Sequence, residues 1–135
     1  MKLKILENKL KVLKMKNDSK VPELVLNQSF YSITRTDEEL SIVLDENIDV
    51  ESDVVEYNWR AIKIEGILDF SLIGILSTIS KILAMANIGI FVISTYNTDY
   101  ILKYYKDTSI GENKFWHVYT IIAQKNWTRV EIYEF

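Results

Sequence analysis

The sequence predicts an α+β fold in which an antiparallel four-stranded sheet carries two helices on one face. Three observations support this: runs that alternate with a two-residue period, two segments with helical spacing of apolar residues, and their β-α-β-β-α-β order in the second half of the chain. The first half follows a shorter, helix-poor version of the same order. We therefore expect an N-terminal domain at residues 1–58 and a C-terminal domain at residues 59–135.

The composition is that of an ordinary globular protein. Of the 135 residues, 48% are hydrophobic and 26% are charged, and the formal net charge is −3. A chain of this length buries about two thirds of its unfolded surface, and this balance of residues excludes a disordered chain. The acidic balance argues against nucleic acid as a partner, because phosphate binding needs a basic face.

Several features that are absent from the sequence limit the expected cellular location of the protein and the kinds of site it can contain. No apolar run approaches the roughly 20 residues that span a bilayer, and the N-terminus alternates lysines with aliphatic residues instead of forming a signal peptide. We therefore expect a cytoplasmic protein with no membrane partner. The chain has no cysteine, and no catalytic partner is evident for His117, its one imidazole. The sequence thus predicts no enzyme, no metal site and no cofactor.

The first half of the chain predicts mostly strands. Residues 3–15 predict a hairpin of two lysine-rich strands that turns at Glu7-Asn8. Pro22 suits the first turn of a short helix that runs through Leu26, because its missing N–H costs nothing there. Two more strands, at residues 29–34 and 40–44, are joined by a polar turn.

The second half of the chain predicts all six elements of the β-α-β-β-α-β order. After a strand at residues 59–66, apolar residues recur at helical spacing from Gly74 to Ala86. Either Asp69 or Ser71 is suited to cap the start of this helix, and residues 87–89 are suited to end it. The remaining predicted elements are strands at residues 90–95 and 100–105, a helix from Ser109 to about Asn126 with a capping-box start, and a last strand at residues 129–135.

The stretch "STYNTDY", residues 94–100, is unusually polar for the end of a strand. Asp99 has two interpretations: it caps its own turn, or it offers a negative charge to a ligand. Gly74 also has two, since a glycine at a helix start allows tight packing or a close approach of the backbone to a ligand. The residues alone leave both questions open.

Three segments, "SITRTDEELSIV", "LDFSLIG" and "STYNTDYIL", resemble a family of small bacterial proteins made of two tandem ACT domains. The resemblance covers about residues 28–102. The last two signatures are also similar to those in the ACT domains of the animal cytosolic arginine sensor. The resemblance implies two ferredoxin-like domains, a non-catalytic regulatory role, a free amino acid bound at an interface between ACT domains, and a homodimer.

The resemblance also implies where the ligand binds. A free amino acid carries a carboxylate and an ammonium group, so its site needs main-chain N–H donors near a fixed acidic group. The helix start at Gly74 offers the donors, and Asp99 offers the charge. The implied ligand-binding residues are Asp69, Ser71, Gly74, Ile75, Gly89, Ile90, Thr95, Tyr96, Thr98 and Asp99.

Three residues depart from the family pattern. Gly89 stands where a small hydroxyl residue is common, Ile73 replaces a threonine, and Lys103 replaces an aliphatic residue. Each lost hydroxyl removes a hydrogen bond of about 1 kcal/mol, and Lys103 could pair with Asp99 and occupy the site from inside. The alternative function is therefore a structural or protein-interaction module that keeps the ACT fold without a ligand.

The acidic run at residues 45–56 imitates the ligand spacing of a calcium-binding loop. Val50 stands where that loop requires glycine, and the preceding segment predicts a strand rather than an entering helix. The sequence favours a solvated connector.

Overall fold

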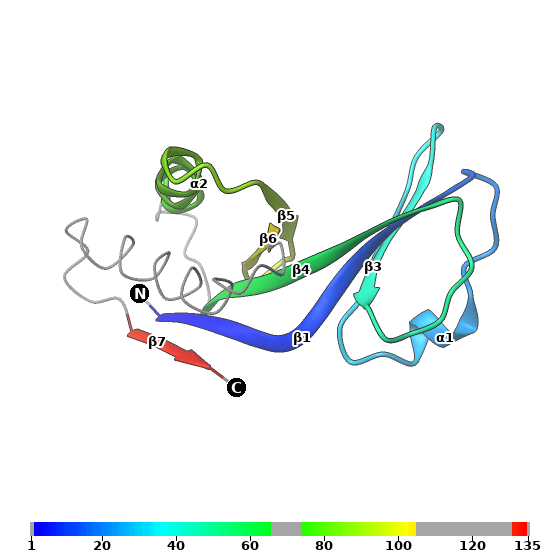
Figure 1. Ribbon diagram of the computed structural model, residues 1–135, viewed down its shortest axis with the longest axis horizontal. Helices are drawn as coiled ribbons and strands as arrows, with labels where there is room; N and C mark the ends of the chain where they lie inside the picture. The colour runs from blue at the N-terminus through cyan, green and yellow to red at the C-terminus, as the bar shows by residue number, and fades with distance from the viewer. Residues whose placement is uncertain (1, 66–73, 105–130, 135) are drawn as a thin grey trace. The chain divides into compact units, whose positions relative to one another are not determined.

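The structure is a computed structural model that describes residues 2–65, 74–104 and 131–134 (Figure 1). Three features predicted from the sequence lie outside these residues. They are the helix from Ser109 to Asn126 that contains His117, and the side chains of Asp69 and Ser71.

The chain divides into two compact units, which are described separately. Unit 1 comprises Met1–Glu7 and Arg60–Phe135, and unit 2 comprises Asn8–Trp59. Strands β1 and β4 each contribute residues to both units. The predominance of antiparallel strands with few helices agrees with the predicted α+β class.

Unit 2 is a small sheet with one short helix. Strand β3 lies between β1 and β2 and pairs antiparallel with both. Pro22 precedes the helix as its extended N-cap residue, one position before the first turn in which the sequence prediction placed it. The elements are β1 (Lys2–Met15), α1 (Glu23–Leu26), β2 (Ser32–Arg35) and β3 (Leu40–Asp45).

One face of this sheet forms the core of unit 2. The register places Leu13 opposite Ile42, and both are fully buried together with Leu40 and Leu44. Lys11 shares this face and is only 4% exposed. Its ammonium donates to the carbonyl oxygen of Ile48 at 2.5 Å and lies 5.7 Å from the ring centroid of Tyr57, so the buried charge has both a hydrogen-bond acceptor and a π face.

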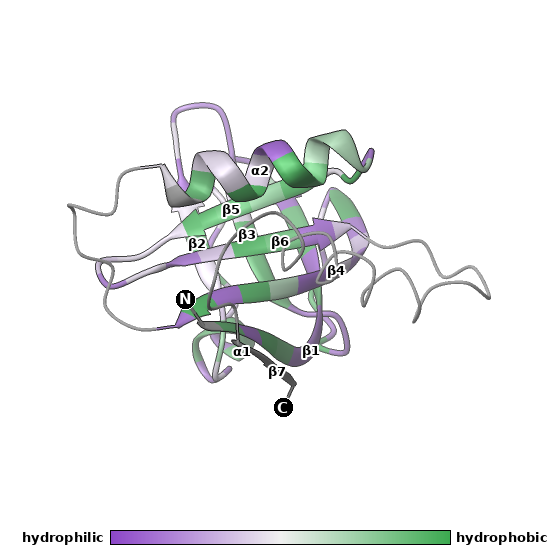
Figure 2. Ribbon diagram, turned by 90° about the vertical axis from the view of Figure 1, so that its left-hand side faces the viewer, coloured by the Kyte–Doolittle hydropathy of each residue, from purple (hydrophilic) through white to green (hydrophobic). Residues whose placement is uncertain are grey.

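Unit 1 combines the second half of the chain with the beginning of β1. Its strand order is β1-β4-β6-β5, and β7 pairs with the other edge of β1. Helix α2 runs beside β5 (Figure 2), and its buried residues pack with residues of β1, β4 and β6. The elements are β4 (Val54–Glu65), α2 (Ile75–Met85), β5 (Ile90–Ser94), β6 (Asp99–Tyr104) and β7 (Glu131–Glu134).

The core of unit 1 lies between α2 and the sheet, and β1 contributes to it. The buried residues come from β1 (Leu3, Ile5), β4 (Ile62, Ile64), α2 (Ile79, Ile82, Leu83) and β6 (Ile101). Residues 2–5 of β1 pair in parallel with residues 131–134 of β7. The N-terminal strand therefore supplies both backbone pairing and apolar side chains to the unit that contains the C-terminus.

The predicted hairpin at residues 3–15 is wrong, because β1 is one continuous strand. A tight two-residue hairpin turn needs positive φ angles, which are usually supplied by glycine or asparagine. Neither Glu7 nor Asn8 has a positive φ. Glu7, Asn8 and Lys9 are all exposed, and the strand runs through them from unit 1 into unit 2 without a turn.

The start of α2 also differs from the prediction. Gly74, not Asp69 or Ser71, is the N-cap residue, with φ of 90° and no side-chain capping bond. The N–H and the hydroxyl of Thr78 both donate to the carbonyl oxygen of Gly74 at 2.9 Å. The predicted end of the helix is confirmed, since Asn87 adopts a left-handed φ of 57° and Ile88 donates its N–H to the carbonyl of Leu83.

Candidate functional site

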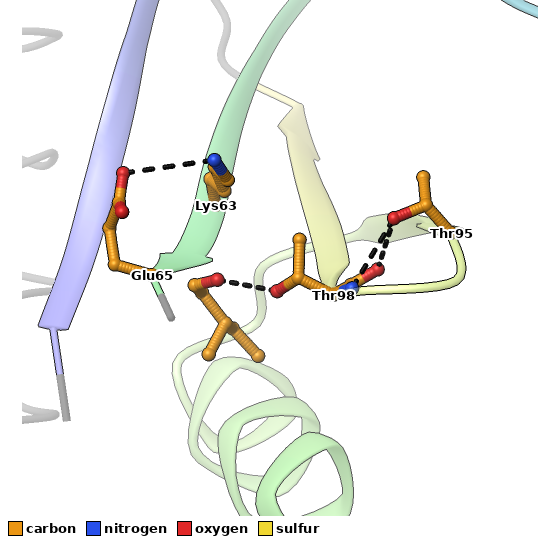
Figure 3. Close-up of polar contacts among 5 residues, drawn as sticks. Lys63, Glu65, Thr95 and Thr98 are labelled. Atoms are coloured by element: carbon orange, nitrogen blue, oxygen red, sulfur yellow. Dashed lines mark hydrogen bonds and ion pairs between the residues drawn. The ribbon is translucent and has the colours of Figure 1, made fainter. Parts of the chain in front are cut away.

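The polar turn between β5 and β6 is built by two threonines (Figure 3). Thr95 donates its N–H to the carbonyl oxygen of Thr98 at 2.8 Å, and its hydroxyl accepts the N–H of Thr98 at 3.3 Å. Neither Tyr96 nor Asn97 has a positive φ, so this is not the usual two-residue hairpin turn. The Thr95 side chain supplies the acceptor that closes it.

Thr98 fixes the turn to the neighbouring strand. Its side chain is 4% exposed, and its hydroxyl donates to the carbonyl oxygen of Ile64 near the end of β4 (Figure 3). Both predicted ligand contacts, Thr95 and Thr98, therefore use their hydroxyls to hold the protein's own backbone. Tyr96, which the sequence also predicted to contact the ligand, is 92% exposed at the tip of the turn.

Replacing Thr98 with valine should destabilise the protein by about 1–3 kcal/mol, because a buried hydroxyl-to-carbonyl bond is lost without a change in shape. Urea unfolding measures this effect. Thr34→Val is the matched control, since Thr34 is exposed on β2 and its change should stay within about 0.5 kcal/mol. A Thr98→Val protein as stable as the parent would show that the hydroxyl has no structural role.

Asp99 begins β6 on the face of the sheet that carries α2. It shares this face with Ile101, because side chains two residues apart in a strand point the same way, and Ile101 packs in the core with Ile79 and Leu83 of α2. Ser94 lies directly opposite Asp99 in the register. Asp99 is half-buried, and among the described residues no side chain forms a hydrogen bond or ion pair with its carboxylate.

The start of α2 lies at the same end of the sheet as Asp99. Four residues, 86–89, connect the end of α2 to the beginning of β5, and the helix lies along that strand (Figure 2). The helix and β5 therefore run in opposite directions, so Gly74 and Ile75 are at the end where β5 finishes and β6 begins. The first N–H groups of a helix have no intrahelical acceptor and carry the positive end of its dipole.

The nearby acid at the end of β4 is oriented differently. Glu65 alternates with the buried Ile64, so it lies on the face opposite α2. Its carboxylate is 3.9 Å from the ammonium of Lys63 on the same strand (Figure 3). Of the two acids Asp99 and Glu65 at this end of the sheet, Asp99 is the one that lies on the helix side.

Gly89 and Ile90 lie at the other end of β5. Ser94 follows Ile90 by four positions, which corresponds to about 13 Å along a strand, and Ile90 is opposite Lys103 in the register. The structure therefore does not bring these two predicted site residues together with Asp99. Lys103 is 3% exposed, and within the described residues it forms no ion pair with Asp99.

Ser94 is a site residue that the sequence analysis omitted. It lies directly opposite Asp99 in the register, so the two side chains are neighbours on the helix side of the sheet. The signal was available in the sequence, because a two-residue loop at Tyr96-Asn97 between the paired residues Thr95 and Thr98 fixes Ser94 opposite Asp99.

This arrangement suits a small molecule that carries both a positive and a negative charge. The helix start favours an anionic group, while Asp99 favours a cationic group that donates hydrogen bonds.

Within the described ranges, no group of three or more potential metal-ligating side chains is found. No helix of the described residues is long and apolar enough to cross a membrane.

Family comparisons agree with this architecture. Residues 54–107 match the model of the ACT domain family, so the chain contains an ACT domain, a class of module that is typically regulatory and binds small ligands. Residues 8–51 match a different family model, which describes an N-terminal domain. A second ACT domain in that region is not supported by these matches. No curated protein matches the sequence.

Two solved structures share the fold over nearly the whole chain. A crystal structure of a protein from Agobacterium tumefaciens is 28% identical, with a TM-score of 0.80 over 99% of this chain and 92% of that one. A protein of unknown function from Vibrio cholerae, described as a possible transport protein, is 16% identical, with a TM-score of 0.63 over 91% and 88% of the two chains. The second similarity concerns the fold alone.

Proposed function

We propose that this protein is a non-catalytic regulatory protein whose ACT domain binds a free amino acid. The carboxylate of the ligand binds the N–H groups at the start of α2, and its ammonium group binds Asp99 and Ser94. The observation that supports this most directly is the position of Asp99. A half-buried acid without a partner among the described residues lies on the helix side of the sheet, at the end where α2 begins.

The proposal includes several finer points that rest on the resemblance to tandem ACT proteins. The N-terminal half is a diverged second ACT domain, the ligand lies at a domain interface, and the protein acts in the cytoplasm as a homodimer without nucleic-acid or membrane partners. The structural roles of Thr95 and Thr98 refine the site. The ligand contacts in our proposal are therefore Asp99, Ser94 and the backbone at Gly74 and Ile75, and not the threonine hydroxyls.

Thermal unfolding in the presence of each of the twenty amino acids tests the function. A ligand at about 100 times its Kd should stabilise the fold by about 2.7 kcal/mol, which is several degrees in Tm for a protein of this size. An amino acid that raises Tm is then compared with two analogues, one without the ammonium group and one without the carboxylate.

Neither analogue should raise Tm at the same concentration, because each leaves one half of the site unpaired. Two outcomes contradict the proposal: no amino acid changes Tm, or the analogue without the ammonium group stabilises as well as the amino acid. The first outcome would favour the alternative, a protein-interaction module that has kept the ACT fold without a ligand.

A further inference from the structure

The two units share one plan of connections. Unit 2 follows the order β1-α1-β2-β3 and unit 1 the order β4-α2-β5-β6. In each unit the second and third strands form an antiparallel hairpin, and the third strand lies beside the first. Corresponding positions can therefore be compared between the units, strand by strand.

The hairpin turns of the two units also share the same hydrogen bonds. In unit 2, Thr36 donates its N–H to the carbonyl of Glu39 at 2.9 Å, and its hydroxyl accepts the N–H of Glu39 at 3.2 Å. These are the bonds that Thr95 makes with Thr98 in unit 1. Thr36 and Glu39 therefore correspond to Thr95 and Thr98, residue by residue.

This correspondence pairs the residues on either side of each turn. Arg35 takes the position of Ser94, and Leu40 takes the position of Asp99, because each pair is directly opposite in its register. Leu40 is fully buried in the core of unit 2. Where unit 1 has a hydroxyl and an acid, unit 2 therefore has a cation and an apolar residue.

The Arg35 guanidinium forms hydrogen bonds with two backbone carbonyl groups. It donates to the carbonyl oxygen of Asn17 and, at 2.7 Å, to that of Ser19. These two residues belong to the loop that connects the first strand of unit 2 to its helix. The Asn17 side chain in turn donates to the carbonyl of Asp37 in the hairpin turn at 2.9 Å, so the loop and the turn are tied together through Arg35 and Asn17.

We infer that unit 2 is a self-occupied copy of the unit 1 site, in which the Arg35 side chain takes the place of a bound cation. Leu40 removes the acid that would hold an external ammonium group, and Arg35 supplies the protein's own cation to the loop carbonyls. Unit 2 thus binds no amino acid, and each chain binds one ligand, in unit 1. The count of ligands and the comparison of Arg35 with a bound cation rest on the proposed function; the contribution of the Arg35 hydrogen bonds to the stability of unit 2 does not.

Chemical rescue tests the role of Arg35 without any ligand of unit 1. Arg35→Ala should lower Tm by several degrees, and guanidinium chloride at about 20 mM, far below denaturing concentrations, should restore part of the loss. Sodium chloride at the same concentration should not restore the Tm of the variant, and guanidinium chloride should not raise the Tm of the parent protein. Arg35→Ser, which copies the residue of unit 1, should respond in the same way if the alanine variant folds poorly.

Lys20→Ala is the matched control, since it removes a positive charge from an exposed residue of the same loop region and should show neither the loss nor the rescue. The inference is overturned if guanidinium and sodium chloride act alike on the Arg35 variants, or if guanidinium stabilises the parent equally.

The count of ligands is tested by calorimetric titration of the full chain with an amino acid that raises its Tm. One equivalent per chain supports the inference, and two equivalents overturn it while leaving the proposed function intact. If no amino acid binds, the proposed function fails, and the rescue experiment still decides the role of Arg35.

Discussion

Replacing Asp99 with asparagine should weaken amino-acid binding by roughly tenfold to a hundredfold, because a hydrogen bond to a charged group contributes about 1.5–3 kcal/mol. Asparagine keeps the size of the side chain and removes its charge, so the ammonium group of the ligand loses its counter-ion. The stabilisation by ligand measured in thermal unfolding should fall accordingly, and calorimetric titration should show the higher Kd.

The same variant should leave the free protein about as stable as the parent. Asp99 is half-buried and forms no bond with the side chains of the described residues, so no stabilising contact among them is lost. Asp53→Asn is the matched control, an exposed acid before β4 that should change neither binding nor stability. If Asp99→Asn loses stability and retains full affinity, the carboxylate is a structural cap and the site lies elsewhere.

The sequence predicted most elements of the fold because alternation and helical spacing are local signals. Helix α2 and the hairpin of β5 and β6 appear within one or two residues of their predicted positions. The error at Glu7-Asn8 has a different origin. Two short lysine-rich runs look alike whether they fold back on each other or form one strand, and the choice depends on the partners β3, β4 and β7, which are distant in the sequence.

The candidate site was predicted less completely than the fold. Asp99 and the helix start at Gly74 were predicted from the family resemblance, because the residue types alone left their roles open. The sequence could not show that the hydroxyls of Thr95 and Thr98 form hydrogen bonds with the backbone. Polar side chains in a turn can bond either to a ligand or to the backbone. Nor could the sequence separate Ile90 from Asp99, which are at opposite ends of one hairpin.

The hairpins of the two units share their turn hydrogen bonds but differ at the position that the proposed ligand requires. The turn bonds made by Thr36 and Thr95 are the same, yet the residue that follows the turn is Leu40 in one unit and Asp99 in the other. A fold tolerates this exchange, because both positions lie on the helix side of a strand. The proposed ligand site does not tolerate this exchange, because unit 2 then has no acid at the position that would bind an ammonium group.

Replacing Leu3 with alanine should destabilise unit 1 by about 2–5 kcal/mol, the usual cost of removing a fully buried leucine side chain. Leu3 is 0% exposed and packs with Ile64, Leu83 and Ile101, so the cavity would open beneath α2. For a domain of 60–100 residues, each kcal/mol lowers Tm by about 4–8 °C. Because Asp99 and the start of α2 depend on the same core, the response to ligand should weaken as well.

Hydrogen exchange shows which unit the N-terminal strand stabilises. In Leu3→Ala, the amides of β6 should exchange faster than in the parent, before those of β3. The matched variant is Leu13→Ala, the same change on the same strand but in the core of unit 2, and it should accelerate exchange in β3 first. Glu7→Ala, exposed between the two positions, should change neither. If Leu3→Ala leaves β6 as protected as in the parent, β1 does not belong to the core beneath α2, and the candidate site folds independently of the N-terminus.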